Sequence, residues 1–173
     1  MITPMSSPAP RNLDDLIPLA TEVLDAMKAK GLMLATAESC TGGLISGVLT
    51  EIPGSSAVVD RSFVTYSNEA KSDMLGVSPG LIQSVGAVSK DVAMAMAEGA
   101  LKNSNADITV SVTGIAGPGG GSEDKPVGTV HVAVAVRGKT TQHMHCWFAD
   151  RGRQSIRLET VQTALTSVLN AAT

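Results

Sequence analysis

The alternation of short apolar runs with amphipathic segments is the feature that most constrains what this chain can fold into. Apolar residues recur at steps of three and one from residue 13 to residue 27, which predicts a helix that ends at Gly31. The apolar run at 32–37 carries no helical stripe and predicts a buried strand. The remaining predicted elements are a helix at 44–49, a strand at 57–66, helices at 68–75 and 89–103, strands at 107–112, 127–136 and 140–148, and a helix at 156–169, with irregular segments at 76–86 and 113–126.

This order of elements predicts an α/β fold, a three-layer α/β/α sandwich in which helices cover both faces of one sheet. Gly138 and Lys139 separate the last two strands and predict an antiparallel hairpin, so the sheet should be mixed and mostly parallel. A length of 173 residues suits one domain with a full core. We therefore expect a single domain at 13–173, preceded by a flexible tail at 1–12 that lacks the apolar segment of a signal peptide.

Charge and composition argue against several classes of function. The formal net charge is −3 and aromatic residues make up 2% of the chain, so neither a basic nucleic-acid surface nor a base-stacking platform is expected. No apolar run approaches the roughly 18 residues of a membrane span. The two cysteines, Cys40 and Cys146, are too few for a disulfide framework and favour a reducing compartment. The sequence thus predicts a cytoplasmic protein that binds neither nucleic acid nor membrane.

Small and polar residues follow three of the expected strands, at 37–43, 65–71 and 113–118. Functional groups in open α/β sheets gather at the carboxyl ends of the strands, so we expect these segments to meet in one cleft. Ser39 precedes a helix whose free N–H groups could stabilise an oxyanion while the hydroxyl attacks a carbonyl, and Gly42 and Gly43 would let a ligand approach the backbone. Alternatively, Ser39 or Thr41 only caps this helix. Cys40 is either a second nucleophile or a small buried hydrophobe.

A nucleophilic serine needs a base, and no histidine lies near Ser39 in the sequence. All three histidines belong to the late strands: His131, His143 and His145. Lys71 can act as a base if burial or nearby positive charge lowers its pKa, and Tyr66 lies at the same strand end. The alternative is that Lys71 is a solvated lysine on the surface of a helix.

Other candidate groups also have two interpretations. The glycine-rich stretch at 117–121 either supplies N–H groups for a phosphate or forms a flexible surface loop. Arg151 and Arg153 precede the last helix, where they either clamp a phosphate or form a solvated turn. His143 and His145 share one face of a strand and could bind zinc, but a third ligand is not evident, which favours a solvated face.

Six stretches of the chain resemble the C-terminal domain of the CinA (competence/damage-inducible) family, also known as nicotinamide-nucleotide amidohydrolases. They are TAESCTGG (36–43), PGSS (53–56), FVTYSNEAK (63–71), GAVS (86–89), GIAGPGGGSEDKPVGTV (114–130) and DRGR (150–153). The chain resembles the stand-alone form, because the N-terminal domain of longer family members has no counterpart in it. It reads PGGGS where relatives often read PDGGS.

The resemblance implies hydrolysis of nicotinamide mononucleotide to nicotinic acid mononucleotide and ammonia, without a metal or organic cofactor. It implies that Ser39 is the nucleophile and that Tyr66 and Lys71 assist proton transfer. The residues expected to bind the nucleotide are Thr41, Gly42, Gly43, Asn68, Thr113, Gly114, Gly117 and Arg151. Family members tend to form dimers or larger assemblies, so a homo-oligomer is expected. Two alternatives stay open, a nucleotide-sensing module without turnover and an amidohydrolase for a different substrate.

Overall fold

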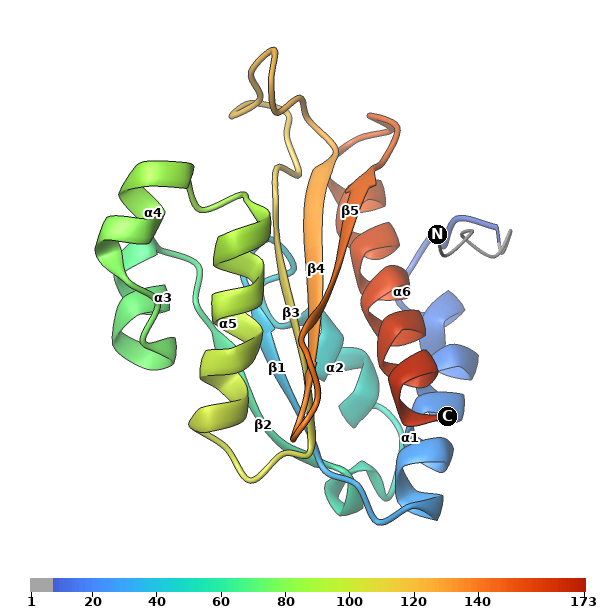
Figure 1. Ribbon diagram of the computed structural model, residues 1–173. Helices are drawn as coiled ribbons and strands as arrows, with labels where there is room; N and C mark the ends of the chain where they lie inside the picture. Colours follow the sequence, from blue (N-terminus) through green and yellow to red (C-terminus); the bar gives the residue numbers. More distant parts are fainter. Residues whose placement is uncertain (1–7) are drawn as a thin grey trace.

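The computed structural model describes residues 8–173 and contains a five-stranded sheet in the order β2-β1-β3-β4-β5 (Figure 1). The strands are β1 (Leu34–Glu38), β2 (Val59–Val64), β3 (Ile108–Gly114), β4 (Thr129–Val136) and β5 (Gln142–Trp147). β1 pairs in parallel with β2 and β3, whereas β4 pairs antiparallel with β3 and β5. The predicted mixed sheet is confirmed. Only β4 opposes the other strands in direction, but just two of the four pairings are parallel.

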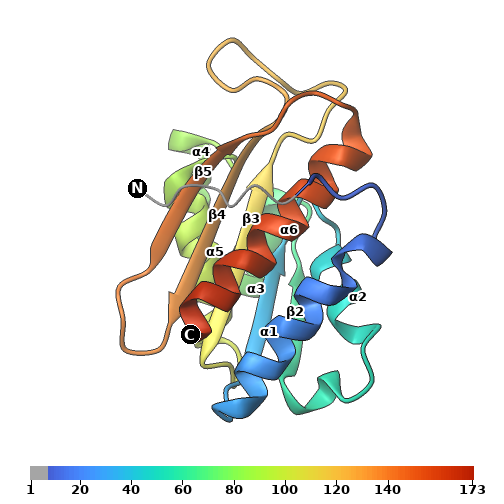
Figure 2. The ribbon, with the colours of Figure 1, turned by 90° about the vertical axis from the view of Figure 1, so that its right-hand side faces the viewer.

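Helices cover both faces of the sheet (Figure 2), which confirms the predicted three-layer α/β/α sandwich. One layer contains α1 (Ile17–Ala29), α2 (Leu44–Thr50) and α6 (Arg153–Ala172). The other layer contains α3 (Asn68–Leu75), α4 (Pro79–Val85) and α5 (Lys90–Lys102). Within residues 8–173, no helix combines the length and apolarity that crossing a membrane requires.

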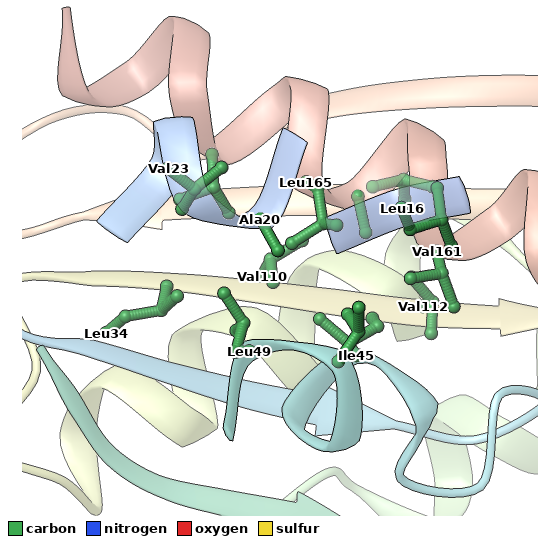
Figure 3. Close-up of a cluster of buried hydrophobic side chains, with 14 of the residues drawn as sticks. Leu16, Ala20, Val23, Leu34, Ile45, Leu49, Val110, Val112, Val161 and Leu165 are labelled. Atoms are coloured by element: carbon green, nitrogen blue, oxygen red, sulfur yellow. The ribbon is translucent and has the colours of Figure 1, made fainter. Parts of the chain in front are cut away.

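The larger core lies between the sheet and the layer of α1, α2 and α6 (Figure 3). Val23 of α1 and Leu165 of α6 pack there with Val110 and Val112 of β3, and all four side chains are fully buried. Burying one such side chain contributes about 1.5–3 kcal/mol. This core therefore holds α6 firmly against the sheet, and α6 carries arginine side chains to the carboxyl edge of β1.

Small residues let α5 of the opposite helix layer approach both the sheet and the neighbouring helix α3 closely. Alanines form the contact between α5 and β4: Ala93, Ala97, Ala133 and Ala135. A Cβ atom at Gly99 of α5 would lie 2.0 Å from the carbonyl oxygen of Leu75 in α3, so only glycine permits this approach. The contact fixes the position of α3, which is the helix that carries Lys71.

The prediction of an irregular segment at 76–86 is wrong, because Pro79–Val85 form α4. Ser78 caps this helix through the N–H of Leu81, and Pro79 occupies its first turn. Ile82 is its one buried residue, so no apolar stripe marks the helix in the sequence. Of the tail predicted at 1–12, residues 1–7 lie outside the described residues, and residues 8–12 form neither helix nor strand.

Candidate active site

The Ser39 hydroxyl and the Lys71 amine meet at the carboxyl edge of the sheet. Ser39 directly follows β1, and Lys71 lies in the first turn of α3, which begins where Ser67 accepts the N–H of Ala70. Lys71 Nζ lies 3.0 Å from Ser39 Oγ. The Lys71 side chain is only 1% exposed. Two of the strand ends thus meet as expected, and the alternative of a solvated Lys71 is wrong.

Three main-chain carbonyl groups surround the Lys71 amine. Their oxygens lie 2.8 Å (Thr65), 3.3 Å (Tyr66) and 3.5 Å (Ser67) from Nζ. No carboxylate pairs with this amine in the part of the chain that the structure describes. Burial therefore lowers the pKa of Lys71 below its ordinary value. A neutral amine donates to two carbonyl groups and keeps a lone pair for the Ser39 hydroxyl, which is the arrangement of a general base.

Glu38, which the sequence reasoning missed, fixes the turn that carries Ser39. Its fully buried carboxylate accepts five hydrogen bonds of 2.7 to 3.3 Å, from the hydroxyls of Thr36, Thr41 and Ser62 and from the amides of Ile45 and Ser46. Two N–H groups of the α2 N-terminus therefore bind a protein carboxylate, whereas the sequence suggested that they were free for a ligand. The sequence did contain a signal for this role, namely a carboxylate at the end of an apolar strand. A charge that is buried there needs several hydrogen-bond donors around it.

The turn after Ser39 keeps three amide groups without a protein acceptor. The N–H of Gly42 donates to the carbonyl of Ser39 at 3.0 Å, whereas the N–H groups of Cys40, Thr41 and Gly43 donate to no acceptor within residues 8–173. Gly42 and Gly43 have φ angles of +60° and +103°, a conformation that favours glycine. The amides of Cys40, Thr41 and Gly43 are therefore free to donate to a ligand, while the Thr41 hydroxyl is bonded to Glu38.

Arg153, and not Arg151, reaches across the carboxyl edge of the sheet. Its guanidinium donates to the carbonyl of Gly117 at 2.8 Å and to the hydroxyl of Tyr66 at 3.1 Å. These two groups follow β3 and β2, and β1 lies between those strands, so the Arg153 side chain crosses the end of β1. Arg151 forms an ion pair with Glu159 of α6. The Tyr66 ring is 63% exposed, and only its carbonyl group contacts Lys71.

The other predicted binding residues lie at different depths. Thr113 is buried beside Ser39 across the β1–β3 pairing and donates its hydroxyl to the carbonyl of Ala87 at 2.9 Å. Gly114 ends β3 at a close approach to β4, where a Cβ atom would lie 2.6 Å from a methyl group of Val130. Asn68 is exposed at the first position of α3. Thr113 therefore lies next to Ser39 in the sheet, Gly114 lies against β4, and Asn68 is exposed.

Cys40 and the histidines do not form the alternative sites that the sequence left open. Burial raises the pKa of the Cys40 thiol to about 12, so it stays protonated at neutral pH and is a poor nucleophile. His131 Nδ1 lies 2.8 Å from His143 Nε2, and the His131 ring stacks on His145 with 4.2 Å between centroids. Stacked rings do not converge on one point. Residues 8–173 hold no cluster of three or more His, Cys, Asp or Glu side chains suited to a metal ion.

Comparison with known proteins finds relatives of a single family. The model of the CinA C-terminal domain matches residues 16–172. Nicotinamide-nucleotide amidohydrolase PncC of Escherichia coli K12 is 52% identical over 138 residues, which cover 79% of this chain and 84% of that protein. A CinA-like protein of Akkermansia muciniphila is 48% identical over 153 residues, or 88% of this chain and 37% of that protein.

Solved structures lead to the same family. The crystal structure of the competence/damage inducible protein CihA from Agrobacterium tumefaciens matches with a TM-score of 0.88 and 54% identity, covering 95% of this chain and 99% of that one. A competence damage-inducible protein A (ComA) from Klebsiella pneumoniae matches with a TM-score of 0.85 and 36% identity, covering 89% and 94%. Because the family model matches residues 16–172 and a relative is 52% identical over 79% of the chain, this chain belongs to the CinA C-terminal domain family.

Proposed function

We propose that this protein hydrolyses the carboxamide group of nicotinamide mononucleotide and releases nicotinic acid mononucleotide and ammonia. The buried contact between Ser39 Oγ and Lys71 Nζ carries the proposal, because it joins a hydroxyl to an amine whose pKa is lowered. The 52% identity to a protein named nicotinamide-nucleotide amidohydrolase supports the choice of this amide and this nucleotide.

In the first half-reaction, the lone pair of Lys71 takes the hydroxyl proton while Ser39 Oγ attacks the carboxamide carbon. The negative charge that develops on the carboxamide oxygen is stabilised by the free amides of Thr41 and Gly43. The carbonyl groups around Nζ stabilise the ammonium that forms, in the absence of a carboxylate partner. Lys71 then gives this proton to the leaving nitrogen, the C–N bond breaks, and the nucleotide is left as an ester on Ser39.

In the second half-reaction, the neutral Lys71 takes a proton from a water molecule whose oxygen attacks the ester carbon. The ester bond to Ser39 breaks, and Lys71 returns the proton to Oγ. The same amine therefore acts as base and acid in both halves, which requires a pKa near the working pH. This scheme needs neither a metal ion nor an organic cofactor.

For the phosphate group of the nucleotide we propose Arg153 in place of Arg151. Arg153 lies across the end of β1, and a phosphate could replace its present carbonyl and hydroxyl acceptors. The exposed ring of Tyr66 stands next to Arg153, where it can pack against the pyridinium. Proton transfer then rests on Lys71.

Ammonia release from nicotinamide mononucleotide tests the proposal, with the wild type and Ser39→Ala measured side by side. We expect release by the wild type and loss of release in Ser39→Ala. Binding without turnover by the wild type would instead favour a nucleotide-sensing module, and turnover of other amides alone would favour a different substrate. The homo-oligomer that the resemblance implies stays a prediction, which sedimentation equilibrium would test.

A further inference from the structure

Arg157 holds the turn after Ser39 from the opposite side of the sheet. Its Nε donates to the carbonyl of Cys40 and its terminal nitrogen donates to the carbonyl of Thr41, each at 3.0 Å. Arg157 belongs to α6, whereas Lys71 belongs to α3 in the other helix layer. The two basic side chains thus approach the same short turn from opposite faces.

These two hydrogen bonds fix the direction of an amide group. A trans peptide is planar, so the carbonyl of Cys40 and the N–H of Thr41 point in opposite directions. The carbonyl points to Arg157 of α6, and the Thr41 N–H therefore points away from that side chain, whereas Lys71 belongs to α3 in the other helix layer. This N–H has no acceptor within residues 8–173.

We propose that Arg157 is a positioning residue that orients the Thr41 N–H as the main oxyanion donor. The inference rests on the proposed function, because an oxyanion forms only if Ser39 attacks a carbonyl group. Arg157 acts through the main chain, since both of its hydrogen bonds go to main-chain carbonyl groups of the turn.

Two further observations indicate that the turn after Ser39 is held rigidly. The guanidinium of Arg157 lies directly against Gly42, since its terminal nitrogen would be 3.4 Å from a Cβ atom there, which is ordinary contact. Glu38 holds the same turn on its other flank through the Thr41 hydroxyl at 2.7 Å. Main chain that is clamped at both ends keeps its donor in place before the reaction begins, which is what oxyanion stabilisation requires.

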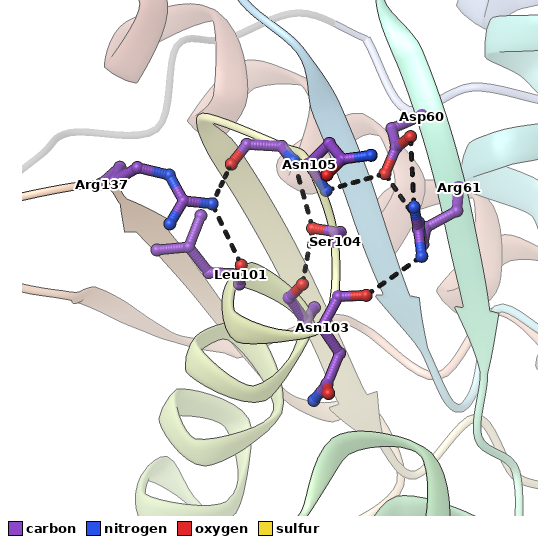
Figure 4. A network of polar contacts seen from close by, with 9 residues as sticks. Asp60, Arg61, Leu101, Asn103, Ser104, Asn105 and Arg137 are labelled. Carbon is purple, nitrogen blue, oxygen red and sulfur yellow. Dashed lines mark hydrogen bonds and ion pairs between the residues drawn. The ribbon is translucent and has the colours of Figure 1, made fainter.

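The chain supplies a matched control for an arginine that clamps two carbonyl groups. Arg137 donates to the carbonyls of Ala106 at 2.7 Å and Leu101 at 3.2 Å (Figure 4). It follows β4 and lies at the opposite edge of the sheet from Ser39, because β4 is antiparallel to β3. Arg137→Lys and Arg157→Lys therefore remove the same kind of clamp, one far from the site and one next to it.

We expect Arg157→Lys to lower kcat for nicotinamide mononucleotide about 100-fold, as the loss of an oxyanion donor does, with KM little changed. The 3-aldehyde analogue of the substrate, which forms a tetrahedral adduct with Ser39, should bind weaker by a similar factor. Binding of nicotinic acid mononucleotide should not change, because it forms no oxyanion adduct. Arg137→Lys should keep wild-type kcat even if its Tm falls by as much or more.

A wild-type kcat in Arg157→Lys would overturn the proposal. Equal losses of affinity for the aldehyde analogue and for nicotinic acid mononucleotide would also overturn it, because they would indicate a general disruption of the site. A second readout does not depend on the natural substrate. A fluorophosphonate probe that labels Ser39 should react about 100-fold slower with Arg157→Lys than with the wild type. If the wild type is labelled but releases no ammonia, the proposed substrate is wrong, and the labelling ratio still decides the role of Arg157. A wild type that is not labelled contradicts the oxyanion site itself.

Discussion

Replacing Lys71 by methionine keeps an unbranched side chain of similar length and removes the amine next to Ser39. The loss of a general base lowers rates by about 10²- to 10⁴-fold, and we expect kcat/KM of Lys71→Met to fall within this range. The stability effect is smaller. The carbonyl of Thr65 loses its 2.8 Å donor, which costs about 1–3 kcal/mol, but a poorly compensated buried amine is also removed. We therefore expect the variant to fold and to be nearly inactive.

The pH dependence separates a base from a structural lysine. Burial lowers the pKa of Lys71, and the neutral amine is the active form, so wild-type kcat/KM should rise with pH, with a midpoint below 10.5, the ordinary lysine value. Lys71→Met should lose this rise. The lowered pKa also means that the folded wild type binds fewer protons than the unfolded chain. The contribution of Lys71 to stability is therefore fully present above pH 10.5 and declines as the pH falls toward the lowered pKa. Over the same pH range, the wild type should lose stability and Lys71→Met should not. The Tm of Lys71→Met should therefore rise relative to the wild-type Tm as the pH falls.

Ammonia release measured over a range of pH, together with thermal unfolding of both proteins, gives all of these quantities. A folded Lys71→Met that keeps a tenth or more of wild-type kcat/KM would refute the assignment of the base, as would a pH profile that is the same in both proteins.

Three further predictions concern other parts of the molecule. Glu38→Gln replaces an acceptor of five hydrogen bonds by an amide that cannot accept them all, so kcat should fall at least 10-fold and Tm should drop, as activity and unfolding assays would show. Burial lowers the pKa of His131 from 6.5 to about 4, so its contribution to stability, at most about 3 kcal/mol before screening, is present above pH 6.5 and is lost as the pH falls toward 4. The stability difference between wild type and His131→Gln should therefore change over that range, and an unchanged difference in denaturant titrations would contradict it. Arg153→Lys should raise KM for the nucleotide more than Arg151→Lys does, and the reverse order would restore Arg151 as the phosphate ligand.

The meeting of Ser39 and Lys71 could be predicted because it depends on topology alone. Parallel strands of a sheet present their carboxyl ends at one edge, and both residues follow such ends within a few positions. The spacing from the end of β2 at Val64 to Lys71 also puts the lysine in the first turn of a helix, where it can turn back to the edge. The burial of the amine needed the structure, since it depends on how closely α3 packs on α5.

The choice between Arg151 and Arg153 could not be made from the sequence. Successive helix positions turn by about 100°, so the start of a helix decides which side chain faces a site. Gly152, with a φ of +99°, ends the preceding loop, and α6 begins at Arg153. Arg153 and Arg157 then share one helix face at a spacing of four residues, and both reach the edge of the sheet. The role of Glu38 was hidden for a similar reason, because its donors come from four separate segments.

Mass spectrometry of the enzyme quenched in acid during a single turnover of nicotinamide mononucleotide tests the central claim most directly. The account predicts an acyl adduct on the peptide that contains Ser39, with an added mass equal to nicotinamide mononucleotide less ammonia, absent from Ser39→Ala. Product formation at the wild-type rate without any adduct, or an adduct on Cys40 in place of Ser39, would contradict it.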